Sequence, residues 1–214
     1  MQQVKEESSP EIASRVQVPK AVVVIGASTG GPSALAKIFP KFPKDFPVSI
    51  VVVQYMRPGF TKLLARQLDG ISEVFVDEAE TYLPLKPAAA FLAPGHCSVR
   101  VERIEDPECP PFTLTAEDVS SSVEKLRRRV DDAMISAAET FGAHTIGVLL
   151  TGVGDDGRDG MKAIREFGGK TLAQDESSSI VFDMPRSAIN AGVVDEVVPL
   201  WNIAERVIEI VGDS

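Results

Sequence analysis

From Ala21 onward the chain alternates between short apolar runs and amphipathic segments. Four runs of mainly apolar residues predict buried strands, at 21–25, 48–54, 145–150 and 170–173. Apolar residues at helical spacing predict helices over 32–39, 61–68, 119–141, 157–167, 185–191 and 201–211. Because fully apolar strands divided by helices favour a parallel sheet buried on both faces, we predict an α/β fold: a doubly wound, mainly parallel sheet with helices on both faces.

One section interrupts this alternation. Its apolar runs, at 74–76, 89–92 and 99–104, are short and separated by Pro and Gly, which is typical of β-hairpins. We therefore predict a β-hairpin insertion at one edge of the sheet. Residues 1–18 are polar and lack the apolar centre of a signal peptide, so we interpret them as a flexible N-terminal segment or the remnant of a linker. Residues 19–214 would then form a single domain.

The bulk composition excludes several classes of protein. Hydrophobic residues make up 44% and charged residues 25%, and no apolar run approaches the ~20 residues that cross a bilayer. The net charge of −9 argues against a nucleic-acid partner, because phosphate binding needs clustered positive charge. Cys97 and Cys109 fit neither a disulfide framework nor a metal motif. We expect a cytoplasmic protein without metal, cofactor or membrane insertion.

The densest basic run is KLRRR, from Lys125 to Arg129, followed closely by two aspartates. We interpret this run as a solvated helix face, and a docking patch for an acidic partner is the alternative.

A serine follows the first predicted strand on a glycine-rich turn. Residues 26–30 read Gly-Ala-Ser-Thr-Gly and match G-x-S-x-G between a strand and a helix, the context that exposes a nucleophile. Backbone N–H groups at the start of the next helix would stabilise an oxyanion. The alternatives are a phosphate-binding turn and a purely structural turn. The acidic residue of a Rossmann turn and the Gly-Lys-Ser/Thr of a Walker loop are both absent, so Ser28 as a nucleophile is favoured.

The residues alone do not identify a base for this serine. Asp155 and Asp156 follow a predicted strand and could orient a histidine, bind a metal or cap the next helix. Of the two histidines, His96 lies in the hairpin section, and His144 precedes a strand at the end of the sheet opposite Ser28. Neither follows a core strand at its carboxyl end, where sites of such sheets lie.

Five segments together resemble the catalytic domain of the chemotaxis receptor methylesterase (CheB) family. They are IGASTGGPSAL, VVVQYMRPGFTKLLARQL, FLAPGH, IGVLLTGVGDDGRDGM and AQDESSSIVFDMPRSAINAGVVDEVVPL. The resemblance implies a methylesterase-like catalytic domain over 19–214, without the family's receiver domain. It implies hydrolysis of glutamate methyl esters on the cytoplasmic region of chemoreceptors, or another chemosensory partner, by a Ser-His-Asp triad. By position, Ser28 matches the nucleophile and Asp156 the orienting aspartate, with Thr29 and Val153 in the oxyanion or binding region.

The chain departs from the family pattern at the base. Where the family reads Gln-His-Met, this sequence has Gln54-Tyr55-Met56. A phenol is almost fully protonated at pH 7 and is a poor base, so we predict weak or lost activity at a site of Ser28, Tyr55 and Asp156. Val153 replaces a Met, and 115–122 replaces a Pro- and Arg/His-rich stretch. The alternative is a non-catalytic binding or regulatory module that keeps the fold and the cleft.

Overall fold

The structure, a computed structural model, describes residues 17–106 and 108–213. The predicted N-terminal segment, 1–18, lies outside the described residues except for its last two. In the described part of the chain, no helix combines the length and the apolar character that a bilayer span requires.

The core of the fold is a seven-stranded sheet in the order β10-β9-β8-β1-β2-β5-β3, and its strand pairs are parallel. The strands are β1 Val22–Ala27, β2 Ser49–Gln54, β3 Phe75–Glu78, β5 Ala89–Leu92, β8 Thr145–Leu149, β9 Lys170–Gln174 and β10 Glu196–Val198. Within it, Ala27 pairs with Gln54 and Gly26 with Leu149. The carboxyl ends of β1, β2 and β8 therefore meet at one edge, where the polar residues that follow them come together.

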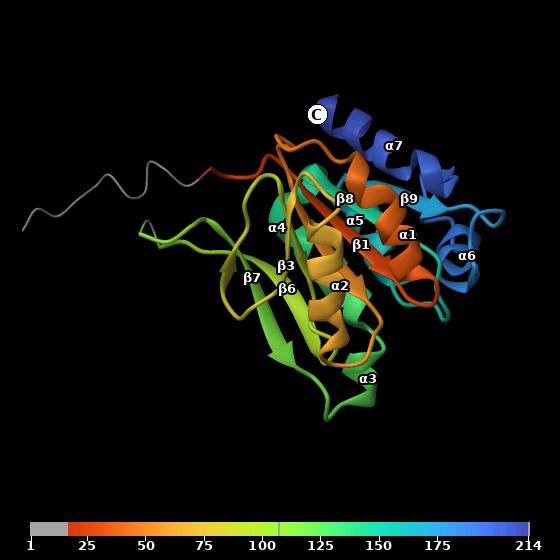
Figure 1. The fold of residues 1–214 in the computed structure, drawn as a ribbon, viewed down its shortest axis with the longest axis horizontal. Helices are drawn as coiled ribbons and strands as arrows, with labels where there is room; N and C mark the ends of the chain where they lie inside the picture. The colour runs from red at the N-terminus through yellow and green to blue at the C-terminus, as the bar shows by residue number, and fades with distance from the viewer. Residues whose placement is uncertain (1–16, 107, 214) are drawn as a thin grey trace, which may run out of the picture.

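Helices cover both faces of this sheet (Figure 1). They are α1 Gly31–Ile38, α2 Phe60–Asp69, α4 Arg129–Phe141, α5 Arg158–Glu166, α6 Asp183–Asn190 and α7 Leu200–Gly212. The short helix α3 Val123–Leu126 has no buried residue and lies outside these layers. Val23 and Ile25 of β1 pack with α1, α2 and α7, whereas Val22 and Val24 pack with α4, α5 and α6. Alternate strand residues thus enter two separate cores, and the predicted doubly wound sheet is confirmed.

The predicted hairpin section is only partly a hairpin. The runs at 74–76 and 89–92 were expected there, but β3 and β5 pair in parallel within the main sheet. Their apolar side chains pack in the cores of the main sheet, and this burial outweighs the Pro and Gly signals around them. The third run does form a hairpin: β6 Cys97–Arg103 pairs with β7 Phe112–Asp118. With β4 Leu83–Pro84 they make a separate antiparallel sheet, which extends away from the main sheet in Figure 1.

The single helix predicted over 119–141 is two helices, α3 and α4, separated by Arg127 and Arg128. The Ser122 hydroxyl caps α3 by accepting the N–H of Lys125 at 3.2 Å. Val119 lies outside both helices, in the turn after β7, where its N–H donates to the carbonyl of His96 at 3.0 Å. The break matters because it places the N-terminus of α4 against the edge of the main sheet that carries Ser28.

Candidate active site

The backbone around Ser28 is held by the ends of two neighbouring strands. The Ser28 N–H donates to the carbonyl of Thr151 at 3.1 Å, just beyond β8. The Ser28 carbonyl accepts two hydrogen bonds, from the Gln54 side-chain amide at 2.9 Å and from the Gly31 N–H at 2.9 Å. The turn is therefore fixed by hydrogen bonds to its main chain, from backbone groups and from the Gln54 side chain.

The loop after β8 approaches this turn so closely that only glycine fits at its centre. A Cβ at Gly152 would lie 2.8 Å from Ser28 Cβ and would also collide with the sulfur of Met184. Ser28 and the residues that follow Gly152 line a cavity of about 440 Å³. The cavity is lined by Ser28, Tyr55, Arg127, Val153, Gly154, Asp155 and Asp156.

Backbone donors for an oxyanion are available beside Ser28. The Ser28 N–H is already used, but in the described part of the chain the N–H groups of Thr29, Gly30, Val153 and Gly154 donate to no protein acceptor. The Val153 side chain is 57% exposed at the rim of the cavity. The role of Thr29 and Val153 in an oxyanion site stays a prediction, for which this geometry supplies the donors.

Tyr55 and Asp156 contact each other directly. Tyr55 follows β2, and its hydroxyl donates to Asp156 Oδ2 at 2.5 Å. Asp156 is only 7% exposed, and its carboxylate also accepts the N–H groups of Val130 at 2.8 Å and Asp131 at 2.9 Å. The structure thus brings Ser28, Tyr55 and Asp156 into one cavity, with the phenol hydrogen directed at the carboxylate.

Asp156 and Asp131 cap each other's helices. Asp156 precedes α5 but binds the first N–H groups of α4, whereas Asp131 of α4 accepts the N–H groups of Gly157 at 2.9 Å and Gly160 at 2.8 Å at the start of α5. The alternative that an aspartate caps the following helix is therefore wrong for Asp156, which caps the preceding one. Asp155 is exposed and forms an ion pair with Arg158 at 3.6 Å.

Burial raises the pKa values of Tyr55, Asp156 and Asp131. Burial of the phenol, and then the adjacent Asp156, raise the pKa of Tyr55 well above its usual value near 10. Burial also raises the pKa of Asp156, although its hydrogen bonds act in the opposite direction. Burial raises the pKa of Asp131 to about 6, opposed mainly by the hydrogen bond from Gly160. Ser28 therefore shares its cavity with a protonated phenol, which cannot take a proton as imidazole does.

The three successive arginines of the basic run occupy three different environments. Arg127 lines the cavity with Ser28, Arg128 pairs with Asp131 at 3.8 Å and Asp159 at 3.7 Å, and Arg129 is 1% exposed. The prediction of a solvated helix face is therefore wrong for Arg129. A local signal existed, because Arg129 lies at helical spacing from the buried residues Ala133, Ser136 and Ala137 on α4.

The buried guanidinium of Arg129 joins the hairpin section to the site. It donates to the carbonyls of Cys97 at 2.7 Å, Gly95 at 3.0 Å and Pro94 at 3.0 Å. Its central carbon lies 5.2 Å from the centroid of the Tyr55 ring. Arg129 was missed from the sequence as a residue of this site.

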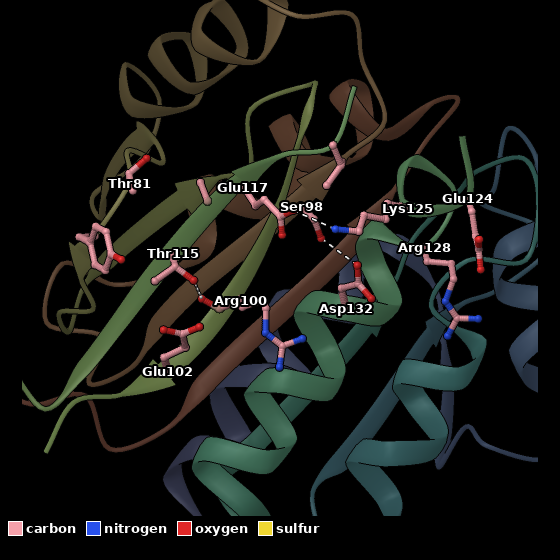
Figure 2. Close-up of a pocket in the computed structure, with 13 residues that line it drawn as sticks. Thr81, Ser98, Arg100, Glu102, Thr115, Glu117, Glu124, Lys125, Arg128 and Asp132 are labelled. Carbon is pink, nitrogen blue, oxygen red and sulfur yellow. Dashed lines mark hydrogen bonds and ion pairs between the residues drawn. The ribbon is translucent and has the colours of Figure 1, made fainter. Parts of the chain in front are cut away.

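A second cavity, of about 550 Å³, lies between the β6–β7 sheet and the helices α3 and α4. Figure 2 shows side chains from both elements pointing toward one another in it. Lys125 pairs with Glu117 at 2.8 Å, and the Ser98 hydroxyl donates to Asp132 at 2.9 Å. These pairings offset the charges of its walls locally, and none of the residues that line it is Ser28, Tyr55 or Asp156.

Neither histidine lines the cavity with Ser28. His96 lies in the turn before β6, and its carbonyl accepts the N–H of Val119 at 3.0 Å. His144 lies just before β8 at the amino end of the sheet, as its place in the sequence predicts, and lines a different cavity. Within the described residues, no group of three or more His, Cys, Asp or Glu is arranged to hold a metal ion.

Known proteins are similar to this chain in sequence and in fold. The family model for the CheB methylesterase domain matches residues 23–207. The protein-glutamate methylesterase/protein-glutamine glutaminase 1 of Carboxydothermus hydrogenoformans is 47% identical over 192 residues, which is 88% of this chain and 54% of that protein. The corresponding protein of Pyrococcus horikoshii is 43% identical over 204 residues, covering 94% of this chain and 52% of that protein. The chain thus spans about half the length of the curated relatives it matches.

A solved structure has the same architecture over nearly the whole chain. It is the crystal structure of the Thermotoga maritima CheB methylesterase catalytic domain, which is 41% identical, with a TM-score of 0.84. The match covers 90% of this chain and 100% of that one.

Proposed function

The chain belongs to the CheB methylesterase family, and from this premise we propose that its cleft binds a methyl-esterified glutamyl side chain but hydrolyses it only weakly. The names of the relatives identify the chemistry: hydrolysis of a glutamate methyl ester or a glutamine amide in a protein. We take the partner to be the methylated cytoplasmic region of a chemoreceptor, so the protein would act in the cytoplasm.

The hydrogen bond from Tyr55 to Asp156, at 2.5 Å, is the observation that carries this proposal. A histidine has two ring nitrogens, so it can accept a proton from serine on one while donating to the aspartate from the other. A phenol has a single oxygen, and here its hydrogen is already directed at Asp156. The raised pKa of Tyr55 keeps that hydrogen in place at neutral pH. Tyr55 is therefore not available as a general base for Ser28 in the resting site.

A slow route to products remains. As Ser28 transfers its proton to the phenol oxygen, Tyr55 would have to pass its own proton to Asp156 in the same step. A carboxylate is ordinarily a weaker base than imidazole, and two coupled transfers replace one. Oxyanion donors and substrate binding alone typically leave about 10³–10⁴-fold catalysis over water when a triad member is lost. We expect activity of this residual size.

The structure around Ser28 supports the proposal that the cleft still binds the ester. Ser28 lies on the fixed turn, Gly152 makes its close approach, and no described residue accepts the N–H groups of Thr29 and Gly30. A non-catalytic binding or regulatory module of a chemosensory pathway is the second candidate. The same Tyr55–Asp156 bond favours it, because each of these groups satisfies the other without a substrate.

Methanol release from a methyl-esterified receptor fragment tests the proposal. The native chain, Tyr55→His and Ser28→Ala are compared, with the Thermotoga maritima catalytic domain as the positive control. We expect a low native rate that Ser28→Ala abolishes and that Tyr55→His raises at least about tenfold. A native rate equal to that of the control would contradict the proposal. Silence in both the native chain and Tyr55→His, with the fragment still bound, would select the second candidate.

A further inference from the structure

Arg129 is a buried cation that forms no ion pair with any residue that the structure describes. Removing a guanidinium from water is costly unless it is paired or fully hydrogen-bonded. In the described part of the chain, no carboxylate lies within ion-pair distance of Arg129, and three carbonyls of residues 94–97 satisfy it instead. No carboxylate of the described residues contacts its positive charge, which lies beside Tyr55 and is stabilised at longer range by Asp156.

The position of Arg129 connects it to every part of the Tyr55–Asp156 pair. It is the first residue of α4, and the next two N–H groups of that helix hold the Asp156 carboxylate. Its side chain ties this helix start to residues 94–97, and its guanidinium lies over the Tyr55 ring. One residue thus positions the carboxylate through the backbone and the phenol through its side chain.

We propose that Arg129 is a positioning residue coupled to Tyr55: it holds the phenol against Asp156 and disfavours a protonated base at position 55. The inference rests on the proposed function and deepens it. It makes the loss of base catalysis a property of two positions, so that Tyr55→His alone restores only part of the activity.

Electrostatics explains why Arg129 is compatible with a tyrosine at position 55 but not with a protonated histidine. A neutral aromatic ring is attracted to a cation over its face, so Tyr55 gains from the guanidinium. A histidine that accepts the serine proton becomes an imidazolium, which would then face a second buried cation at about the same distance. At about 5 Å and an effective dielectric constant of about 20, this repulsion lowers a pKa by roughly 2 pH units.

Other charged groups also face position 55. Asp156 contacts it directly and would raise the pKa of an imidazole there, whereas Arg127 and Asp155 line the same cavity with opposite charges. All three are unchanged in the comparison below, so the difference between variants reports on Arg129.

The experiment compares Tyr55→His with two double variants, Tyr55→His/Arg129→Gln and Tyr55→His/Arg129→Lys. Gln keeps a donor for the carbonyls but removes the charge, whereas Lys keeps the charge. The pKa of the imidazole introduced at position 55 is followed by NMR, where His96 and His144 are the only other histidine signals. We expect that pKa to be higher by about 1 unit or more in the Gln variant and nearly unchanged in the Lys variant.

Activity provides the second readout. Methanol release should rise at least about tenfold from Tyr55→His to the Gln double variant, and the pH–rate profile should shift in the direction of the NMR pKa. The Lys double variant should show neither change. Circular dichroism and thermal unfolding confirm that each variant is folded, and Arg129→Met removes the charge by a second route if Gln is not tolerated.

The outcomes separate the two proposals. An imidazole pKa that is the same with Arg129, Gln and Met at position 129 would overturn the coupling, whatever the activity. A raised pKa without any methanol release would support the coupling and contradict the proposed function. A raised pKa with the gain in rate would support both.

Discussion

The two sides of the cleft are built from different materials. The Ser28 side consists mainly of backbone: a strand end, a glycine-rich turn, and main-chain groups from α1 and from the loop after β8. Among the described residues, the Gln54 side-chain amide is its one side-chain donor to Ser28. The opposite side consists of side chains. Tyr55 donates to Asp156, the carboxylates of Asp156 and Asp131 accept N–H groups at two helix starts, and Arg129 lies over the Tyr55 ring. A substitution changes a side chain but leaves the backbone groups in place. Catalytic groups can therefore be lost from the second side while the first side keeps its structure.

Asp156 shows how the comparison changes the interpretation of a retained residue. In a triad it would orient a histidine, but here it caps α4 with two backbone hydrogen bonds. The fold therefore requires this carboxylate whether or not the site is catalytic. Ser28 has no comparable side-chain role among the hydrogen bonds of the described residues, so Ser28 is the better indicator of retained chemistry.

Removing the Asp156 carboxylate should have the largest effect on stability. Asp156→Ala leaves two N–H groups of α4 and the Tyr55 hydroxyl without their acceptor, and we expect a loss of about 4 kcal/mol in the free energy of unfolding. Urea unfolding measures it. The matched control is Asp155→Ala, whose side chain is 71% exposed and which should cost less than about 0.5 kcal/mol. Equal losses in the two variants would show that the side-chain side is not structural.

Asp131, on the side of the cleft built from side chains, should also make the free energy of unfolding depend on pH. Because the pKa of Asp131 is raised to about 6 in the folded state, above its unfolded value near 3.9, the folded protein binds more protons between these values. Stability should therefore be highest below about pH 4 with respect to this group, and fall by about 3 kcal/mol in total as pH rises through 6, about 2 kcal/mol of it between pH 4.5 and 7. Urea unfolding at pH 4.5 and pH 7 should show this slope in the native chain and a smaller one in Asp131→Asn. If Asp131→Asn shows the same slope as the native chain, the pH dependence comes from a group other than Asp131.

Adding one methyl group at Gly152 tests the side of the cleft that carries Ser28. Gly152→Ala places a Cβ against Ser28 and Met184, and we expect a loss of about 1 to 2 kcal/mol together with displacement of Ser28. Gly70→Ala is the control, because its added Cβ would meet only backbone atoms at 3.5 Å or more. Thermal unfolding and the position of Ser28 in a crystal structure of the variant are the measurements. A variant as stable as the control, with Ser28 in place, would mean that this side tolerates change as readily as the other.

The hydroxyl of Tyr55 should have the smallest effect. Tyr55→Phe keeps the ring over which Arg129 lies and removes one donor to Asp156, at a cost of about 1 kcal/mol. Tyr82→Phe, at a side chain that is 71% exposed, should change nothing measurable in the same urea titration. A cost above about 3 kcal/mol for Tyr55→Phe would mean that the phenol contributes more to the fold than its hydrogen bond explains.

The backbone side was largely predictable from the sequence. The strands at 21–25 and 145–150, and the G-x-S-x-G turn between strand and helix, are local patterns that depend on few distant contacts. The main errors lay where distant contacts decide. β3 and β5 joined the main sheet because of their burial, and α4 starts at Arg129 because Asp156, 27 positions later, caps it.

The side-chain side was predicted only through the resemblance to the family. That resemblance put Tyr55 where a histidine stands and Asp156 opposite it, and the structure places the two in contact. Helical spacing was a local signal for the burial of Arg129, but its partners and its position over Tyr55 could not be predicted. Its burial depends on the carbonyls of residues 94–97, more than 30 positions away along the chain.

The central claim is that Ser28 lacks a base, and its reactivity toward a small fluorophosphonate tests this most directly, because no receptor fragment is needed. Labelling rates are compared among the native chain, Tyr55→Phe, Ser28→Ala and Tyr55→His/Arg129→Gln. The account predicts that the native chain labels little faster than Ser28→Ala, whereas the double variant labels Ser28 at least about 100-fold faster than the native chain. Rapid native labelling of Ser28 that Tyr55→Phe abolishes would contradict it, because the phenol would then be the working base.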